Sequence, residues 1–135
     1  MSDQSASRTP LSQAELDALK ALWELGPSPA GDVRHILGLQ GRAWAYTTTK
    51  TILDRLEEKG YVRRDRSGTP HVYVPVVSAD GVARERLGEI RDDLFAGRDL
   101  PLVRALLDGA RLAPDEIAEL RASLDIMEAA EWRDT

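Results

Sequence analysis

The segment 42–75 constrains the fold most, because a helical pattern passes there directly into a hairpin pattern. At 100° per residue, one side of the helix carries Thr49, Ile52, Leu53 and Leu56. Lys59 and Gly60 supply a helix stop, and a strand pattern begins at Tyr61 without a linker. We therefore predict an amphipathic helix that leads at once into β structure.

The outer face of this helix is hydroxyl-rich and basic at its start and acidic at its end. It carries Thr47, Thr51, Asp54 and Glu58, with Thr48, Lys50 and Arg55 on its flanks. A helix that enters the major groove with its first turns contacts base edges there, and its last turns point away. Hydroxyl groups and a lysine suit contacts with bases and phosphates. The alternative interpretation is an ordinary solvated amphipathic helix.

The segment 61–74 has the pattern of a basic hairpin. Two strand-like runs, 61–66 and 71–74, flank a turn cluster at 67–70. Three arginines lie near its tip, with too few acidic residues beside them to neutralise them: Arg63, Arg64 and Arg66. Such a ribbon contacts phosphates or enters a minor groove, and the alternative is an edge hairpin kept soluble by charge. A helix of this polarity followed by a basic hairpin is typical of a winged helix-turn-helix that binds DNA.

Candidate DNA-binding residues follow from these two elements. They are Arg42, Tyr46, Thr47, Thr48, Lys50, Thr51, Arg63, Arg64, Arg66, Thr69 and His71. The net charge of −5 agrees with this role once it is divided along the chain. Residues 1–77 hold 10 basic and 9 acidic residues, whereas residues 78–135 hold 8 and 14. Because DNA binding depends on local charge, the acidic C-terminal part is expected to face away from the duplex.

Two further helices are predicted upstream, as a helix-turn-helix requires. Ser12 and Glu15 have the spacing of a capping box, which predicts a helix over 12–25. Ser28 is expected to cap a second helix, with Pro29 at its first position. A connector at 38–41 then leads to the third helix. Trp23 and Trp44 are both expected to pack in the core.

Beyond Pro75 the chain reads as three acidic amphipathic helices, the last of which is predicted to start near Pro114. Their apolar stripes include Leu87, Ile90, Leu94, Leu106, Ile117, Leu120 and Leu124. Helices this short cannot bury all these side chains against one another alone, so we expect the stripes of two chains to form one homodimeric core. The alternative is that they pack back on the winged helix as a monomer. The predicted organisation is an N-terminal disordered arm (1–10), a winged helix (11–77) and a helical dimerisation domain (78–135).

Composition bears on the remaining function classes. Cysteine is absent, which excludes disulfides and thiol chemistry. No stretch resembles a signal peptide or a membrane span, so we expect a cytoplasmic protein without membrane insertion. His35 and His71 have no carboxylates at ligand spacing, and no nucleophile motif is present. We therefore expect no catalytic residue, no metal site and no cofactor.

A winged helix can also be a protein-binding module that never contacts DNA. Such modules typically lack a basic wing and have an apolar or acidic outer face on the third helix. The three wing arginines favour DNA, and protein binding remains the alternative.

The sequence resembles the penicillinase-repressor and methicillin-resistance-repressor family, the BlaI/MecI-like transcriptional regulators, from about Leu11 to Leu124. The matching segments are LSQAELDALKALWELGP, the W-x-Y-T-T run at 44–48, LDRLEEKGYVRR, VYVPVVS and LAPDEIAELRASL. This resemblance implies a homodimeric repressor that binds inverted repeats, commonly with TACA/TGTA half-sites. By position, Thr47, Thr48 and Lys50 match the family's base-contacting turn. Its wing is matched by Arg63, Arg64, Arg66 and Thr69.

Two departures limit what the resemblance implies about induction. The copper-responsive branch carries a cysteine metal-binding motif, which this chain lacks. In the antibiotic-responsive branch, a membrane-bound sensor metalloprotease cuts an Asn-Phe bond in the dimerisation region. The corresponding bond here joins Ala105 to Leu106, so the side chains that define the cleavage site are absent. Ala113 also replaces the family's Ser or Thr helix cap.

Overall fold

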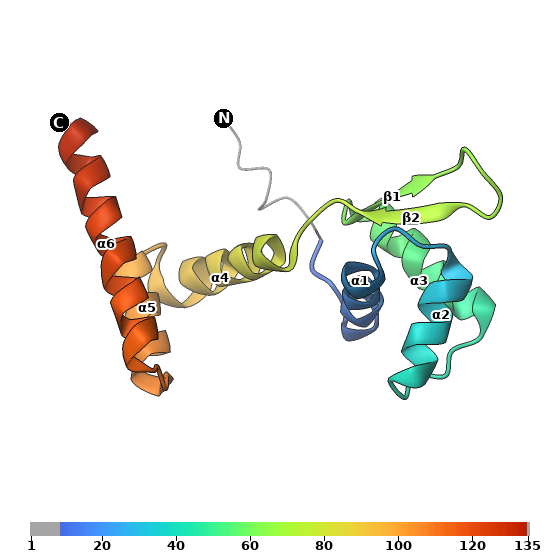
Figure 1. The fold of residues 1–135 in the computed structure, drawn as a ribbon, viewed down its shortest axis with the longest axis horizontal. Helices are drawn as coiled ribbons and strands as arrows, with labels where there is room; N and C mark the ends of the chain where they lie inside the picture. Colours follow the sequence, from blue (N-terminus) through green and yellow to red (C-terminus); the bar gives the residue numbers. More distant parts are fainter. Residues whose placement is uncertain (1–8, 135) are drawn as a thin grey trace.

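The computed structural model describes residues 9–134, which form six helices and one two-stranded hairpin (Figure 1). In chain order these are α1 (Gln13–Leu25), α2 (Ala30–Leu39), α3 (Tyr46–Glu58), β1 (Val62–Asp65), β2 (Val72–Pro75), α4 (Ala79–Phe95), α5 (Asp99–Gly109) and α6 (Pro114–Asp134). The prediction of a mainly helical chain with a hairpin wing is confirmed. Most of the predicted N-terminal arm, residues 1–8, lies outside the described residues.

The elements from α1 to β2 enclose one apolar core, to which α4 adds Val82. The largest fully buried side chains are Tyr73, Leu19, Leu22, Leu37, Leu53, Leu56, Val33 and Thr49. The predicted apolar side of α3 is buried as expected, because Thr49, Ile52, Leu53 and Leu56 all face inward. Trp23 and Trp44 are partly buried and pack against this core. The Trp23 indole N–H also donates to the Val77 carbonyl at 2.8 Å, which ties α1 to the segment that leads into α4.

The helix starts are set by different means. The Ser12 and Glu15 capping box at the start of α1 is confirmed, with bonds of 3.2 and 2.9 Å. The predicted role of Ser28 is wrong: Pro29 is the N-cap of α2, and no side chain caps this helix. Ser28 instead exchanges two backbone hydrogen bonds with Tyr73, of 3.1 and 2.9 Å, which form an isolated β-bridge beside the hairpin. The residues next to Ser28 could not predict this pairing, because its partner lies in a segment distant in the sequence.

The hairpin pairs β1 with β2 antiparallel, in the register Val62↔Pro75, Arg63↔Val74, Arg64↔Tyr73 and Asp65↔Val72. Because successive side chains alternate, Arg64 and Tyr73 share the face that covers α3. Arg63 lies on the outer face and is exposed. The register thus directs Arg64 toward α3 and its neighbour Arg63 toward solvent.

A buried ion pair joins the start of α1 to the end of α3. Glu15 is only 3% exposed, and its Oε1 lies 2.6 Å from Nζ of Lys59, which also donates to the Pro10 carbonyl at 3.0 Å. Burial alone raises the pKa of the Glu15 carboxyl, but the hydrogen bonds from Lys59 and from the Ser12 backbone N–H outweigh it. The net pKa lies below the ordinary value.

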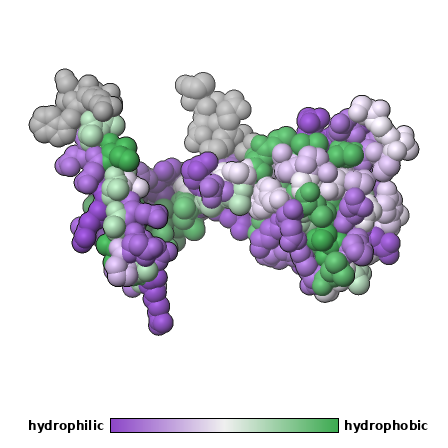
Figure 2. Space-filling view, in the orientation of Figure 1, coloured by the Kyte–Doolittle hydropathy of each residue, from purple (hydrophilic) through white to green (hydrophobic). Residues whose placement is uncertain are grey.

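The helices α4, α5 and α6 extend away from the winged helix (Figure 1). Large apolar side chains stay exposed along them, from Ile117 at 38% to Leu94 at 72%, and no side chain of α5 is buried. Figure 2 shows apolar residues interspersed among hydrophilic ones on the visible face of the C-terminal helices. Within residues 9–134, α5 and α6 contribute no residue to the core of the winged helix, and α4 contributes only Val82. The choice between a homodimer and a packed monomer stays a prediction. No helix in residues 9–134 combines the length and the apolar character that a membrane span requires.

The last helix begins at Pro114, as predicted. Ala113 offers no side-chain oxygen, but its backbone N–H donates to Oε1 of Glu116 at 2.8 Å. Half of a capping box is thus retained without the Ser or Thr of the family.

Replacing Glu15 by Gln should destabilise the winged helix by about 2 kcal/mol at neutral pH, because it leaves a partly buried ammonium without its counter-charge. The lowered Glu15 pKa stabilises the fold above the ordinary value of 4.5, and this contribution is lost as the pH falls through the lower folded value. Urea unfolding at several pH values measures both effects. The difference between wild type and variant should shrink below about pH 4.5; a difference that is constant with pH would contradict the ion-pair assignment.

Candidate nucleic-acid interface

The start of α3 presents polar side chains to solvent. Thr47, Thr48 and Thr51 are exposed, Tyr46 is 45% exposed, and Lys50 is half-exposed. Ala45 occupies the N-cap position and provides no side-chain cap. The structure therefore brings the predicted residues of this turn together on one accessible surface.

The exposed start of α3 is flanked by the wing. A hollow of about 280 Å³ lies between them. It is lined by Ala30, Tyr46, Lys50, Arg64, Thr69, Pro70, His71 and Tyr73. Two cations and several hydroxyl groups contribute to this lining, and none of its described residues is acidic. We call it the wing-side hollow; its charge and polarity suit a phosphodiester group.

Asp54 joins the third helix to the wing beneath this hollow. Its Oδ1 accepts from the Tyr73 hydroxyl at 2.7 Å and from the Arg64 guanidinium at 3.1 Å. Its Oδ2 lies 3.7 Å from Nζ of Lys50, one helical turn earlier. The carboxylate thereby orders two basic side chains that line the hollow. Asp54 thus lies on the predicted outer face of α3, but the wing covers it and leaves its side chain 34% exposed.

Two more contacts fix Arg64. Its Nε donates to Nδ1 of His71 at 3.2 Å, and its guanidinium lies 5.4 Å from the Tyr73 ring centroid. Since an arginine can only donate, Nδ1 of His71 is the acceptor in this hydrogen bond. The Arg64 side chain is only 16% exposed, so it shapes the hollow more than it projects from the wing.

The Tyr73 hydroxyl is held as a hydrogen-bond donor. Burial raises its pKa well above the ordinary value, and the hydrogen bond and charge of Asp54 raise it further. The hydroxyl therefore stays protonated and keeps donating to Asp54 throughout the neutral pH range.

The remaining basic candidates differ in how freely they can contact a ligand. Arg63 is exposed on the outer face of the wing. Arg66 makes two hydrogen bonds to Glu57, at 3.1 and 3.2 Å, but its side chain is 55% exposed and such pairs are weak in water. Arg42 pairs with Asp17 at 2.6 Å and stacks on Trp44, outside the wing-side hollow.

The expectation that too few acidic residues lie beside the wing arginines to neutralise them is wrong for Arg64 and Arg66. The hairpin folds back over α3, whose acidic residues Asp54 and Glu57 meet Arg64 and Arg66. The spacing of Lys50 and Asp54, i and i+4, was the one local signal of this network. The involvement of Tyr73 depended on the register of the hairpin and had no comparable signal.

The C-terminal candidates occupy exposed positions. Leu87, Ile90, Leu94, Leu106, Ile117, Leu120 and Leu124 are all exposed on α4, α5 and α6. The Ala105–Leu106 bond is exposed too, but it lies in the middle of α5. A protease that requires an extended substrate would meet helical backbone there.

Three helices, a β-bridge at Ser28 and a two-stranded hairpin define the winged-helix class of fold. The chain belongs to the penicillinase repressor family, whose model matches residues 11–126. It is therefore a transcriptional regulator of the repressor type and not an enzyme.

Two relatives, a BlaI and a MecI regulator, agree with this membership. The transcriptional regulator BlaI of Mycobacterium tuberculosis is 31% identical over 129 residues, covering 92% of this chain and 89% of its own. The methicillin resistance regulatory protein MecI of Mammaliicoccus sciuri is 24% identical over 115 residues, covering 85% and 93%. A solved MarR family protein from Bacillus stearothermophilus aligns with a TM-score of 0.44 at 19% identity, over 91% of this chain and 76% of its own.

The link between α3 and the wing can be measured with a double-mutant cycle. Tyr73→Phe and Asp54→Ala should each destabilise the protein, and their effects should fall short of additivity by about 1.5 kcal/mol because both remove one charge-assisted hydrogen bond. Urea unfolding of the four proteins gives the coupling free energy. The pair Tyr46→Phe and Asp54→Ala is the control and should be additive. Equal coupling in both cycles would refute the direct link.

Proposed function

We propose that this protein is a sequence-specific repressor that binds inverted-repeat operator DNA as a homodimer. The observation that carries the proposal is the uncapped, hydroxyl-rich start of α3 beside a wing-side hollow lined by Lys50 and Arg64. A protein-binding surface has no need of this concentration of cations around an exposed polar helix start. The functions of BlaI and MecI relatives, as transcriptional and resistance regulators, point the same way.

The arrangement supports one binding pose. The first turns of α3 enter the major groove, where Thr47, Thr48 and Lys50 reach base edges. The wing then lies over the adjacent minor groove, with Arg63, Arg66 and Thr69 at the backbone. The strand that separates the two grooves passes between α3 and the wing, so the wing-side hollow receives one of its phosphates.

Within this pose, the basic residues have separate roles. Lys50 is half-exposed at the recognition turn and reads bases. Arg63 is exposed and contributes uniform affinity through a phosphate. Arg64 and His71 hold each other at the edge of the hollow, so they position the phosphate and the wing.

Dimerisation is supported by the exposed stripes of the C-terminal helices. The stripe on α6 contains Ile117, Leu120, Leu124 and Met127, between 38% and 66% exposed. Burying each such side chain contributes on the order of 1 to 2 kcal/mol, which a monomer forgoes. A two-fold partner would cover these stripes and place two winged helices for the two halves of an inverted repeat.

Under this proposal, release of the repressor from its operator can be induced in two ways. A membrane-bound sensor metalloprotease could cut the dimerisation region, but the Ala105–Leu106 bond would first require local unfolding of α5. The other route is a signal that acts without cleavage. Mass spectrometry of the repressor before and after induction distinguishes them.

Lys50→Ala should weaken binding to a duplex selected from a random pool by about 1 to 3 kcal/mol and relax the base preference. Arg63→Ala should weaken binding to selected and scrambled duplexes alike, with a salt slope less steep by about one unit per subunit. Lys20→Ala, an exposed cation on α1 outside the hollow, is the control. Fluorescence anisotropy with both duplexes measures these effects. If Lys50→Ala keeps the base preference of the wild type, Lys50 does not read bases.

Leu120→Asp should convert the dimer to a monomer and reduce operator affinity at least tenfold, since it places a charge in the apolar interface. Ala118→Asp adds the same charge to the opposite face of α6 and should leave the dimer intact. Sedimentation at micromolar concentration gives the oligomeric state, and thermal melting reports the winged helix. A wild-type protein that sediments as a monomer would contradict the homodimer.

A further inference from the structure

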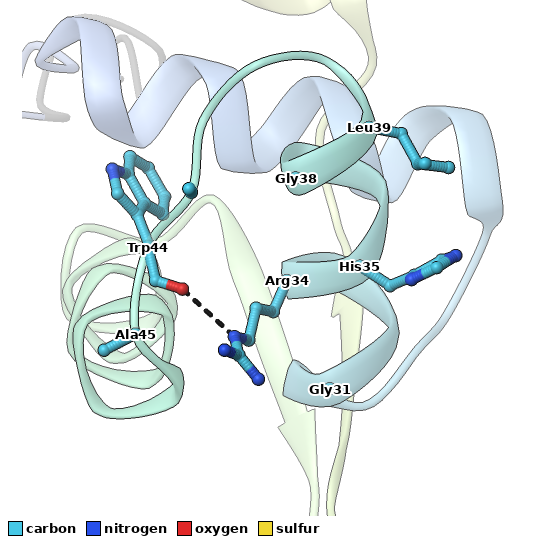
Figure 3. Close-up of a pocket in the computed structure, with 8 residues that line it drawn as sticks. Gly31, Arg34, His35, Gly38, Leu39, Trp44 and Ala45 are labelled. Atoms are coloured by element: carbon cyan, nitrogen blue, oxygen red, sulfur yellow. Dashed lines mark hydrogen bonds between the residues drawn. The ribbon is translucent and has the colours of Figure 1, made fainter.

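A second, larger hollow lies beside the start of α3 (Figure 3). It occupies about 640 Å³ between α2 and the segment that joins α2 to α3. The lining residues are Gly31, Arg34, His35, Gly38, Leu39, Ala43, Trp44 and Ala45. Because Ala45 is the N-cap of α3 and Tyr46 lines the wing-side hollow, the two hollows flank the same exposed helix start. We call the second one the turn-side hollow.

Arg34 is the charged side chain that this hollow holds in place. Its Nε donates to the Trp44 carbonyl at 3.0 Å, which fixes the guanidinium one residue before the N-cap of α3. Figure 3 shows Arg34 reaching from α2 toward Trp44 and Ala45, while His35 and Leu39 project from another side of α2. The two amino groups of the fork are left for an external acceptor.

Arg34 also differs from most cations of the winged helix in its charge balance. Arg42, Lys50, Lys59, Arg64 and Arg66 each have a carboxylate within 4 Å. Across residues 9–134, no carboxylate pairs with Arg34, and none of the lining residues of the turn-side hollow is acidic. A fixed guanidinium without a counter-charge, beside an open and roomy hollow, is suited to a bidentate anion such as a phosphodiester.

The geometry of duplex DNA indicates which backbone would place a phosphate at the turn-side hollow. A major groove about 12 Å wide is bordered by the backbones of two strands. If α3 enters the groove with its first turns, one backbone passes on the wing side and the other on the side of the α2–α3 connection. The turn-side hollow faces the second backbone.

We propose that Arg34 binds a backbone phosphate of the strand across the major groove from the wing. This inference rests on the proposed DNA-binding function and adds a contact that the sequence did not indicate. With one phosphate bound in each hollow, α3 is held between the two DNA strands. This arrangement fixes the depth and rotation of the helix, on which base contacts by Thr47 and Thr48 depend.

The floor of the turn-side hollow offers a test that leaves Arg34 in place. Gly31 and Gly38 lie two turns apart on α2, and a Cβ added at either would meet nothing within 4 Å. Gly31→Glu therefore places a carboxylate at the hollow, and Gly31→Gln places a neutral group of the same size. Since both replace a helical glycine, both variants should fold at least as well as the wild type.

Neutral methylphosphonate links, placed one at a time along both strands of a selected duplex, locate the contact directly. The wild-type protein should lose affinity when a neutral link falls within one cluster of phosphate positions on each strand of a half-site. Arg34→Ala should bind about tenfold more weakly, lose sensitivity at one cluster only, and have a salt slope less steep by about two units per dimer. Arg63→Ala should keep that cluster. Gly31→Glu should weaken binding much more than Gly31→Gln, and Lys20→Ala should behave as wild type.

The outcomes separate the inference from the function on which it rests. If wild type binds no duplex at any salt concentration, the proposed function fails. If wild type binds but Arg34→Ala keeps its salt slope and its methylphosphonate profile, the Arg34 contact is refuted and DNA binding stands. Weaker binding by Arg34→Ala with an unchanged salt slope assigns Arg34 a structural role through Trp44 and likewise overturns the inference.

Discussion

The geometry of the proposed DNA-binding surface depends on the contacts of the Asp54 carboxylate. This carboxylate accepts from Tyr73 and Arg64 of the wing and lies one turn from Lys50 of the recognition helix. A half-buried carboxylate without partners would be costly, so the wing is drawn to a fixed position over α3. The same carboxylate orients the cations that line the wing-side hollow. One acidic side chain thus both stabilises the winged helix and shapes its basic surface.

Local patterns in the sequence predicted the elements, and tertiary contacts determined the interface. The capping box at Ser12, the buried side of α3 and the start of α6 each depend on neighbours within a few residues, so they were predictable. The pairing of Ser28 with Tyr73 and of Arg66 with Glu57 joins segments that only folding brings together. The hydrogen bond that holds Arg34 could not be predicted for the same reason, because its partner is a backbone carbonyl ten residues away.

The two parts of the chain differ in what they can stabilise alone. The winged helix has a continuous core that includes Leu19, Leu53 and Tyr73, all fully buried. The C-terminal helices keep their apolar stripes in water, and the Trp23 to Val77 hydrogen bond helps to anchor the segment through which they are attached. This division serves the proposed function. Assembly of the C-terminal helices sets the spacing of the two winged helices in the dimer. Any event that separates these helices lowers operator affinity without unfolding either winged helix.

The most direct measurement is a titration of the purified protein against a duplex from its own promoter region, with scrambled duplex as competitor, over a series of salt concentrations. The account predicts tight binding that the scrambled duplex cannot compete. The logarithm of the affinity should fall with the logarithm of the salt concentration with a slope of about −5 to −7, as expected for three or four phosphate contacts per subunit. A folded dimer with no affinity for any duplex, even at low salt, would contradict the account and identify this winged helix as a protein-binding module.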